Sequence, residues 1–265
     1  MKNNHSNART VLIIAAGAAG LMAGIRAAEK DPNRQVLIAE RMERPGRKLL
    51  ITGKGRCNVT NCCTIEEFMP NVLTNPRFLY SSLNALSPYE VMGFFEECGV
   101  PLKVERGERV FPVSDHSSDI VNALVQKAKD SGCRFLYNCR IKELLLEQTD
   151  GGEKILADAV IVATGGKSYP ATGSTGDGYQ LARQAGHRVT PLRPSLIPLV
   201  CKEKYCRDMM GLSLKNVTLR VVDTQSGKEV FSELGEMLFT HFGLSGPLVL
   251  SASCHMQPDK NGSLE

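Results

Sequence analysis

The sequence lacks any apolar run long enough to cross a lipid bilayer. Its most apolar segment, from Val11 to Ile25, is shorter than the roughly 18 residues that a membrane-spanning helix needs. With Lys2 and Arg9 before it, this segment would also suit the core of a secretory signal, but that alternative leaves Glu40 and everything after it unexplained. We therefore expect a cytoplasmic protein without a membrane partner.

Metal-binding and disulfide patterns are also missing. The nine cysteines are odd in number, Cys62 and Cys63 are adjacent, and no Cys-x-x-Cys pair occurs. Cys201 and Cys206 enclose four residues, but neither a second pair nor a histidine cluster completes a metal site. The sequence thus predicts no metal ion, and it predicts free thiols in loops or in the core, as in a reducing compartment.

Charged residues form no block of one sign. The 32 Lys+Arg and 28 Asp+Glu give a net charge of +4, and the cations are spread along the chain. Nucleic acid is therefore not a favoured partner, and we expect a small-molecule substrate. With 265 residues, 42% of them hydrophobic, the chain is long enough for one large domain or two smaller ones. Its oligomeric state is not indicated.

The most informative motif is a glycine turn between an apolar strand and a helix. The sequence predicts a strand over Val11–Ala15, a helix over Ala18–Lys30 and a second strand over Gln35–Ala39 that ends at Glu40. In such a βαβ unit a pyrophosphate lies against the helix N-terminus, and the carboxylate accepts hydrogen bonds from a ribose. Ala15 stands at the first glycine position of Gly-x-Gly-x-x-Gly, so we expect a negative φ there.

A connection rich in glycine and cations follows, from Arg44 to Asn61. Glycines let backbone N–H groups approach phosphate or ring oxygens, Arg can bind two oxygens at once, and Lys supplies a point charge. If the ligand contains a flavin, a cation near its N1–O2 edge would stabilise the reduced ring and raise its potential. The alternative is a solvated basic loop. For Cys57 we favour a packed, uncharged thiol over a redox role.

A second strand, glycine segment and helix follow near Ala163. The strand ends in Ala163-Thr-Gly-Gly, and the segment from Thr172 to Gly178 forms a second group of backbone donors before a helix near 178–186. Asp177 is predicted as the N-cap of that helix. This segment lacks the Gly-x-Gly-x-x-Gly spacing, so it indicates no separate NAD(P)H domain. Proline-rich sequence with short strands begins near residue 190, where we predict a domain boundary.

The intervening residues predict further elements. Residues 78–99 favour helix with a break at Ser87-Pro88, and residues 102–113 favour two short strands that turn at Arg106-Gly107. We predict a helix over 118–130, strands over 134–137, 141–147 and 159–163 with a turn at 150–152, and later strands over 216–222 and 229–231.

Together these residues resemble the bacterial FAD-dependent oxidoreductases of the HI-type flavoprotein family, which includes aminoacetone oxidase-like and 3-dehydro-bile-acid reductase-like members. The matching segments are 14–23, 44–61, 163–166, 172–178 and 235–247, of which the second and last are the most specific. The resemblance implies an α/β fold, with a three-layer, Rossmann-like FAD-binding domain over 8–190 and an inserted, mainly β substrate domain over 191–265. Family members continue beyond this length, so the resemblance also implies that a C-terminal part is lacking.

The resemblance also implies which residues contact the cofactor. At the pyrophosphate and the ribose it places Gly17, Ala18, Ala19, Gly20, Glu40 and Arg41. Along the pyrophosphate and flavin it places Gly46, Arg47, Lys48, Thr52, Gly53, Gly55, Arg56, Cys57 and Asn58; Ile141 would meet the adenine, and Ala163, Thr164 and Gly165 would pass near the cofactor. Ala15, Ala16 and Lys54 stand where the family usually has glycine, so we expect altered loop geometry.

We predict an FAD-dependent oxidoreductase whose flavin relays two electrons between a reduced donor, such as NAD(P)H, or oxygen and a small organic substrate. Three alternatives stay open: an NAD-binding dehydrogenase, a flavoprotein that modifies or binds tRNA, and an inactive remnant. His241 is the one candidate proton donor, because an unperturbed imidazole has a pKa near 6.5. A structural role for His241 is favoured, so the catalytic residues are not identified.

Overall fold

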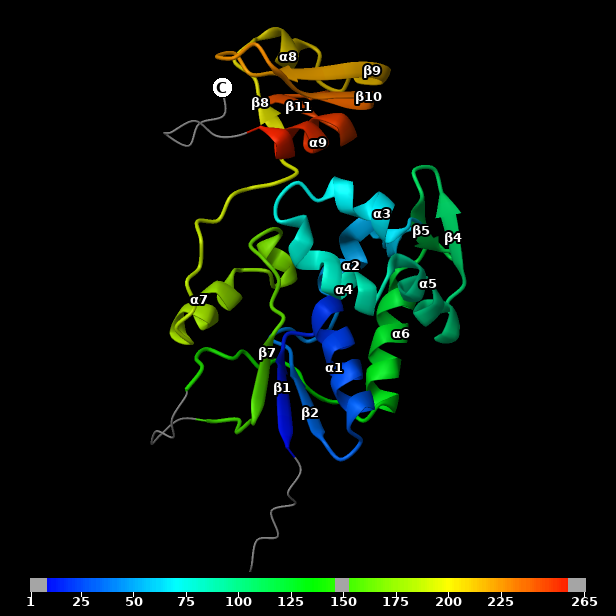
Figure 1. Ribbon diagram of the computed structural model, residues 1–265, viewed down its shortest axis with the longest axis vertical. Coiled ribbons are helices and arrows are strands. Elements are labelled where there is room, and N and C mark those ends of the chain that lie inside the picture. The colour runs from blue at the N-terminus through cyan, green and yellow to red at the C-terminus, as the bar shows by residue number, and fades with distance from the viewer. Residues whose placement is uncertain (1–8, 146–152, 257–265) are drawn as a thin grey trace, which may run out of the picture. The chain divides into compact units, whose positions relative to one another are not determined.

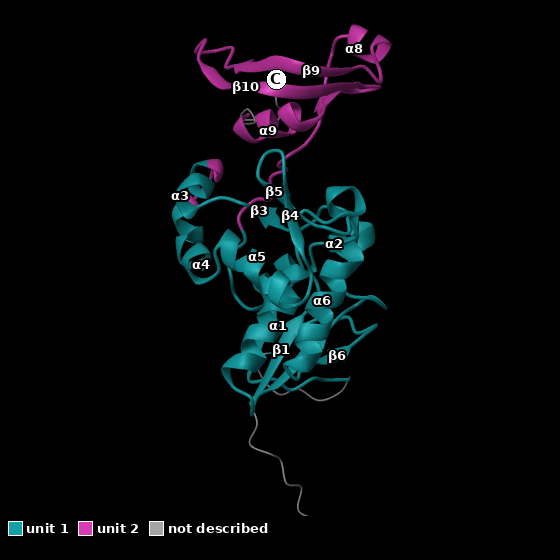
Figure 2. Ribbon diagram, turned by 90° about the vertical axis from the view of Figure 1, so that its right-hand side faces the viewer, with its two compact units in different colours: residues 1–70, 77–189 teal, residues 71–76, 190–265 magenta. Residues whose placement is uncertain are grey.

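The computed structural model describes residues 9–145 and 153–256. Its contacts divide the chain into two compact units (Figure 2). Unit 1 comprises Met1–Pro70 and Arg77–Val189, and unit 2 comprises Asn71–Pro76 and Thr190–Glu265. The sequence predicts cofactor binding for residues 8–190 and substrate binding for residues 191–265, and both roles stay predictions.

A parallel four-stranded sheet forms the centre of unit 1 (Figure 1). Its order is β6 (Arg134–Leu136), β2 (Gln35–Ala39), β1 (Thr10–Ile14) and β7 (Ala159–Val162), and every neighbouring pair is parallel. Parallel strands are joined through crossovers that place helices on the sheet faces, which requires apolar residues on both sides of a central strand. The central strand β1 accordingly buries four of its five residues.

Two apolar layers cover the opposite faces of this sheet. On β1, Val11 and Ile13 belong to the cluster that includes α1 (Ala18–Lys30), α5 (Pro88–Glu97) and α6 (Ser117–Asp130). Leu12 and Ile14 point to the other face and pack with Leu181 of α7 (Asp177–Gln184). Successive side chains of a strand face opposite sides, so this alternation places the sheet between two layers. The predicted three-layer α/β arrangement is confirmed.

Helix α1 has the bounds that the sequence predicts. Its buried residues are Gly20, Leu21, Gly24, Ile25 and Ala28, which form one face at helical spacing. A Cβ at Gly24 would come within 2.8 Å of the side chain of Ile38, so this glycine allows α1 to lie close to β2. The helix ends at Lys30, and its C-cap Asp31 immediately precedes Pro32.

A small antiparallel sheet lies beside this core, with the order β3 (Thr60–Asn61), β5 (Arg109–Pro112) and β4 (Leu102–Glu105). The two short strands predicted for residues 102–113 are confirmed. The predicted helical break at Ser87-Pro88 is confirmed too, because α4 (Tyr80–Ala85) stops before it and Ser87 forms a capping box with Glu90 at the start of α5.

Unit 2 contains an antiparallel sheet with one helix packed on it. Its order is β8 (Leu199–Val200), β11 (Gly243–Ser245), β10 (Glu229–Thr240) and β9 (Ser213–Val222). Helix α9 (Pro247–His255) buries Leu248, Val249 and Ala252, and Leu248 lies over Gly235 of β10. The mainly β content expected of residues 191–265 is confirmed for their described part, 191–256.

The remaining elements are short. They are the helices α2 (Arg47–Ile51), α3 (Ile65–Phe68) and α8 (Tyr205–Asp208) and the 3₁₀ turns η1 (Thr52–Gly55), η2 (Met69–Asn71), η3 (Pro76–Leu79) and η4 (Pro170–Thr172). Within residues 9–145 and 153–256, no helix combines the length and the apolar character needed to cross a bilayer.

Two backbone predictions are wrong, and the predicted turn at 150–152 lies outside the described residues. Ala15 has a φ of 83°, not a negative value. Residues 141–145 form no strand, because Ile141 and Leu144 pack as part of the layer that covers the sheet, and the Leu144 N–H donates to the side chain of Gln184 rather than to a neighbouring strand. Residues 146–152, which include the predicted turn, are outside the described part.

Candidate functional site

A cavity of about 510 Å³ opens where β1, β2 and β7 end. The last residues of these strands, Ile14, Ala39 and Val162, line it, and all other lining residues also belong to unit 1. In open α/β sheets, ligands bind beyond the carboxyl ends of the strands. The topology therefore places the cavity where a ligand is expected.

The start of helix α1 forms one wall of the cavity. Gly17 is the N-cap, and it, Ala18 and Ala19 line the cavity. Gly17 offers no side-chain cap, and the first turn contains no acidic residue. The first N–H groups of a helix have no partner within the helix and lie at its positive end, so this wall presents donors suited to an anion. A Cβ added to Gly17 would meet nothing within 4 Å, which leaves open space above the turn.

The turn before α1 is tightly closed. A Cβ at Gly20 would lie 1.9 Å from the carbonyl oxygen of Ala15, so only glycine fits there. Ala15 carries a methyl group yet has a left-handed backbone, and its N–H donates to the Ala39 carbonyl at 2.7 Å. This close return of the chain explains why the negative φ predicted for Ala15 is wrong: the turn requires the left-handed conformation despite its cost of about 1–2 kcal/mol.

Glu40 joins the turn to the end of β2. Its side chain is buried; Oε2 accepts a hydrogen bond from the Ala16 N–H at 2.7 Å and Oε1 accepts one from the Met42 N–H at 2.9 Å. Glu40 also lines the cavity. A carboxylate oxygen can accept a second hydrogen bond, so Glu40 keeps acceptor capacity for a ligand hydroxyl.

Several cations line the cavity, and they differ in their partners. Arg44 and Arg47 are exposed, and within the described residues the side chain of neither forms a hydrogen bond or an ion pair. Lys48 donates from Nζ to the carbonyl oxygen and hydroxyl of Ser168, and lies 5.6 Å from the ring centre of Tyr169. The two unpaired guanidinium groups give the cavity positive charge for an anionic ligand.

Asp177 holds two further arginines at the cavity. Its Oδ2 lies 3.4 Å from Arg41 Nη1 and 3.2 Å from Arg140 Nε, and Thr175 donates to its Oδ1 at 2.8 Å. Burial favours the neutral acid, but the Thr175 hydroxyl and the charges of Arg140 and Arg41 hold the pKa of Asp177 below its ordinary value. The N-cap of α7 is Gly176 with a φ of 86°, so the predicted capping role of Asp177 is wrong by one residue.

The structure brings together most of the predicted contacts but not all. Among the predicted residues, the cavity is lined by Gly17, Ala18, Ala19, Glu40, Arg41, Gly46, Arg47, Lys48, Ile141, Ala163, Thr164 and Gly165. Gly20 is buried beneath the turn. Thr52, Gly53, Gly55, Arg56, Cys57 and Asn58 do not line the cavity. Cys139 and Arg140 line it without having been predicted, because no local pattern marks them.

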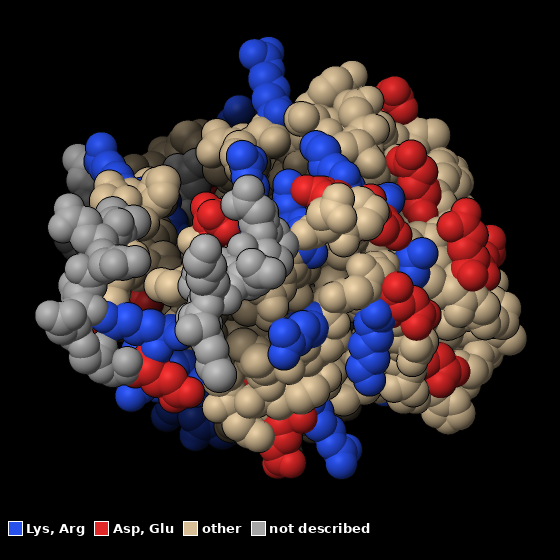
Figure 3. Space-filling view, turned by 90° about the horizontal axis from the view of Figure 1, so that it is seen from below, with Lys and Arg blue, Asp and Glu red and all other residues tan. Residues whose placement is uncertain are grey.

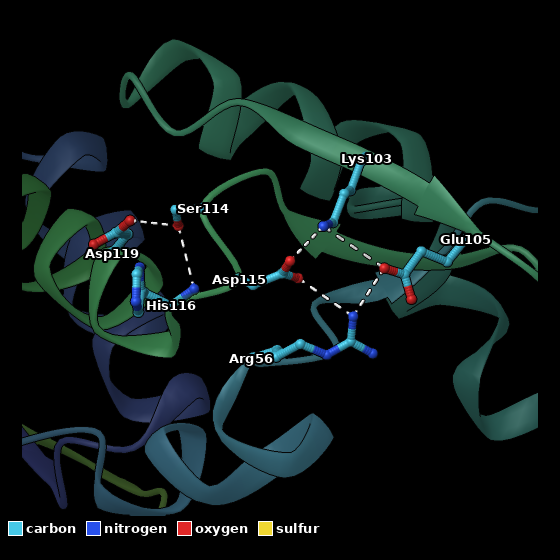
Figure 4. A network of polar contacts seen from close by, with 7 residues as sticks. All are labelled: Arg56, Lys103, Glu105, Ser114, Asp115, His116 and Asp119. Atoms are coloured by element: carbon cyan, nitrogen blue, oxygen red, sulfur yellow. Dashed lines mark hydrogen bonds and ion pairs between the residues drawn. The ribbon is translucent and has the colours of Figure 1, made fainter.

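The residues outside the cavity have structural contacts instead. Cys57 is buried at 1% exposure, and burial raises the pKa of its thiol, which agrees with the packed, uncharged thiol favoured from the sequence. Arg56 pairs with Glu105 and Asp115 (Figure 4). The side-chain amide of Asn58 lies beside the carbonyl oxygens of Thr60 and Val110. Their contact with a flavin stays a prediction.

His241 belongs to unit 2 and has few partners. Its ring meets Phe242 edge-on at 4.9 Å between centroids, and its carbonyl oxygen accepts a hydrogen bond from Arg207. It does not line the cavity, and its role as a proton donor stays a prediction. Among the described residues, no group of three or more His, Cys, Asp or Glu side chains is placed to hold a metal ion.

Charged side chains of both signs share the surface. On the face shown in Figure 3, Lys and Arg lie among Asp and Glu. The expectation that nucleic acid is not a favoured partner stays a prediction.

The HI0933-like protein Rossmann domain family matches residues 9–252. The chain belongs to this family. The 3-dehydro-bile acid delta(4,6)-reductase of Clostridium scindens is 33% identical to the chain over 255 residues, a match that covers 92% of this chain and 59% of that protein. The ribosomal RNA dihydrouridine synthase of Escherichia coli is 31% identical over 252 residues, with 93% and 61% covered. This HI0933-like chain thus spans about 60% of the length of these relatives.

Solved structures confirm the Rossmann-like fold of this HI0933-like chain. The open conformation of a flavocytochrome c3 fumarate reductase matches with a TM-score of 0.54 and 20% identity, covering 80% of this chain and 47% of that one. The FrdA chain of Escherichia coli quinol fumarate reductase matches with a TM-score of 0.53 and 16% identity, covering 78% and 43%.

Proposed function

We propose that this chain binds FAD in the cavity of unit 1 and belongs to an oxidoreductase that adds two hydrogens across a carbon–carbon double bond of a small organic molecule. The supporting observation is the cavity itself, where the uncapped start of α1, the Glu40 carboxylate and unpaired arginines surround one space. A diphosphate flanked by a ribose fits that donor and acceptor set.

The residues present fit each part of such a cofactor. The backbone donors at Gly17 to Ala19 and the guanidinium of Arg47 would hold the diphosphate, and Glu40 would accept a hydrogen bond from the adenosine ribose. The backbone at Ile141 would meet the adenine. When bound, FAD supplies reversible two-electron transfer. In this proposal the chain's own residues bind and orient the cofactor.

The activities for which two relatives are named support the reaction class. Reduction of the Δ(4,6) bonds of a 3-dehydro bile acid and formation of dihydrouridine both add two hydrogens to a double bond conjugated with a carbonyl group. Such a reaction balances when a hydride reaches one carbon and a proton the other. We propose NAD(P)H as the hydride source for the flavin, and we name no protein residue as the proton donor.

A second candidate substrate is ribosomal RNA. Two relatives named ribosomal RNA dihydrouridine synthase, from Escherichia coli and Haemophilus influenzae, are each 31% identical to the chain. The net charge of +4, spread over the sequence, supports the small molecule instead. RNA binding that weakens steeply with added salt would favour the RNA substrate, whereas NAD(P)H-dependent loss of a conjugated enone without RNA would favour the small molecule.

The cofactor proposal is tested by titrating the purified chain with FAD and, separately, with NAD. We expect flavin absorbance on the protein and saturable FAD binding that NAD does not displace. The variant Gly17→Ala should bind FAD at least about tenfold more weakly with an unchanged thermal midpoint, because its methyl group would enter the open space of the cavity without touching the protein. A colourless protein that does not bind added FAD would overturn the proposal.

A further inference from the structure

The loop from Thr52 to Asn58, which follows α2, has an unusual backbone. Gly53, Lys54, Gly55 and Cys57 have φ values of 56°, 60°, 86° and 62°. Lys54 and Cys57 carry a Cβ, and the left-handed conformation is unfavourable for such residues. A backbone of this kind persists only where surrounding contacts hold it in place.

Arg56 anchors this loop to the small sheet (Figure 4). Its Nη1 lies 2.8 Å from Glu105 Oε1 and 3.3 Å from Asp115 Oδ1, and its guanidinium carbon lies 4.0 Å from the ring centre of Phe111. Lys103 Nζ closes the network at 2.6 Å from Asp115 and 3.7 Å from Glu105. Two cations therefore alternate with two carboxylates, and each carboxylate binds both cations.

The position of Asp115 is itself fixed. It has a φ of 58°. The residue before it, Ser114, donates from its hydroxyl to Asp119 at 2.6 Å, and the same hydroxyl accepts a hydrogen bond at 3.2 Å from the N–H of His116, the residue after it (Figure 4). Hydrogen bonding to Lys103 is the main cause that holds the pKa of Asp115 below its ordinary value, and Arg56 adds to it. The carboxylate thus stays charged, and paired with Arg56, at neutral pH.

This network contributes little to global stability. Its four side chains are between 29% and 42% exposed, and ion pairs as exposed as these are weak in water. The loop packs tightly by other means, because Cys57 is buried and a Cβ at Gly53 would come within 2.9 Å of Phe111. The effect of Glu105 and Asp115 is therefore local: they determine where Arg56 lies and how the loop is held.

The loop lies beyond the cavity along the chain. Residues Arg47 to Leu49 of α2 line the cavity, and the loop begins where this five-residue helix ends, about 7.5 Å along its axis from Arg47. In the proposed function, Glu40 and Ile141 bind the adenosine end of the cofactor. The loop is then left for the flavin end.

We propose that Glu105 and Asp115 are positioning residues that act through Arg56 and hold the Thr52–Asn58 loop in the shape that contacts the flavin end of the cofactor. The inference rests on the proposed function. It assigns to the small sheet, which does not line the cavity, the task of fixing that contact.

The experiment compares Glu105→Gln and Asp115→Asn, singly and combined, with the matched control Glu96→Gln, whose side chain is exposed on α5 and has no partner among the described residues. Three quantities are measured for each: the thermal midpoint without cofactor, the dissociation constant of ADP and the dissociation constant of FAD. ADP contains the adenosine and diphosphate but not the flavin, so it reports on the cavity alone.

We expect the double variant to bind FAD about tenfold more weakly than the wild type, with ADP binding and the thermal midpoint unchanged. Trypsin cleavage after Lys54 should also become faster in this variant, because Arg56 no longer fixes that part of the loop to the small sheet. Arg56→Lys keeps one positive charge but loses the planar group that bonds Glu105 and Asp115 together, and it should give the same direction of change.

Equal FAD affinity in wild type and double variant would overturn the inference. A fall in the thermal midpoint together with both affinities would also overturn it, since that result indicates a merely structural role. If the wild type binds ADP but not FAD, or neither, the proposed function fails and this inference with it. Unchanged FAD affinity in the variants of a chain that does bind FAD refutes the inference alone.

Discussion

The backbone N–H of Ala16 donates to Oε2 of Glu40 at 2.7 Å, across 24 residues of sequence. This bond connects the turn before α1 to the end of β2, and both residues are buried. The same carboxylate therefore shapes the turn and faces the cavity. Both the affinity for the cofactor and the stability of this turn should therefore depend on the Glu40 carboxylate.

Replacing Glu40 should reveal both effects. In Glu40→Gln, one of the two acceptor oxygens becomes an NH₂ group that faces a backbone N–H, which should lower the free energy of unfolding by about 1–3 kcal/mol. FAD binding should weaken as well. Chemical denaturation and FAD titration measure the two changes, and Glu43→Gln, an exposed neighbour, serves as control. Unchanged stability in Glu40→Gln would contradict the structural part.

Restoring glycine at position 15 should stabilise the protein. Ala15 has a φ of 83°, and Ala15→Gly removes the conflict between its Cβ and the backbone. The greater freedom of glycine in the unfolded chain offsets part of this gain, so we expect a net increase of about 0.5–1 kcal/mol in the free energy of unfolding. The contrasting variant Ala23→Gly, inside α1, should lose about 1 kcal/mol. Denaturant unfolding of both variants measures the two changes, and a loss of stability in Ala15→Gly would contradict the prediction.

Thiol labelling can locate the cofactor. Of the nine cysteines, all within the described residues, Cys139 alone lines the cavity. FAD or ADP should therefore slow alkylation of Cys139, while the comparably exposed Cys98 and Cys254 keep their rates. Peptide mass spectrometry after timed labelling separates these residues. Equal protection of all three, or of none, would argue against binding in this cavity.

Cys133 should make the protein less stable in alkali. Burial and, to a lesser extent, the charge of Glu29 raise the pKa of this thiol from 9.0 to about 11 in the folded state. Between these values the unfolded chain loses the thiol proton and the folded chain keeps it, so the stabilising effect is complete below pH 9.0 and disappears as pH rises towards 11. The loss should approach 2–3 kcal/mol, at about 1.4 kcal/mol per pKa unit.

The variant Cys133→Ala isolates that contribution. Denaturant unfolding at several pH values from 7 to about 11 should show a shallower alkaline decline in the variant than in the wild type. Parallel curves for the two proteins would show that Cys133 does not keep its proton when folded.

Much of unit 1 was predictable because its signals are local. The bounds of α1 and β2 follow from apolar spacing, and the break before α5 follows from Ser87-Pro88. Local sequence patterns fail where an apolar segment can either form a strand or cover a sheet. Ile141 and Leu144 belong to a short run rich in apolar residues, yet they cover the sheet as an irregular segment, since apolar content alone cannot tell a strand from a covering chain.

The candidate site divides in the same way. The spacing of Gly17, Gly20 and Glu40 is short-range information, so the sequence by itself determined the glycine turn, its helix and the carboxylate that lines the cavity. Only the tertiary structure decided how the charges are paired: Arg41 meets Asp177 across 136 residues, and Arg56 turns to Glu105 across 49. Charge attraction carries no sequence spacing of its own, so which carboxylate meets which guanidinium depends on how the strands and loops are brought together.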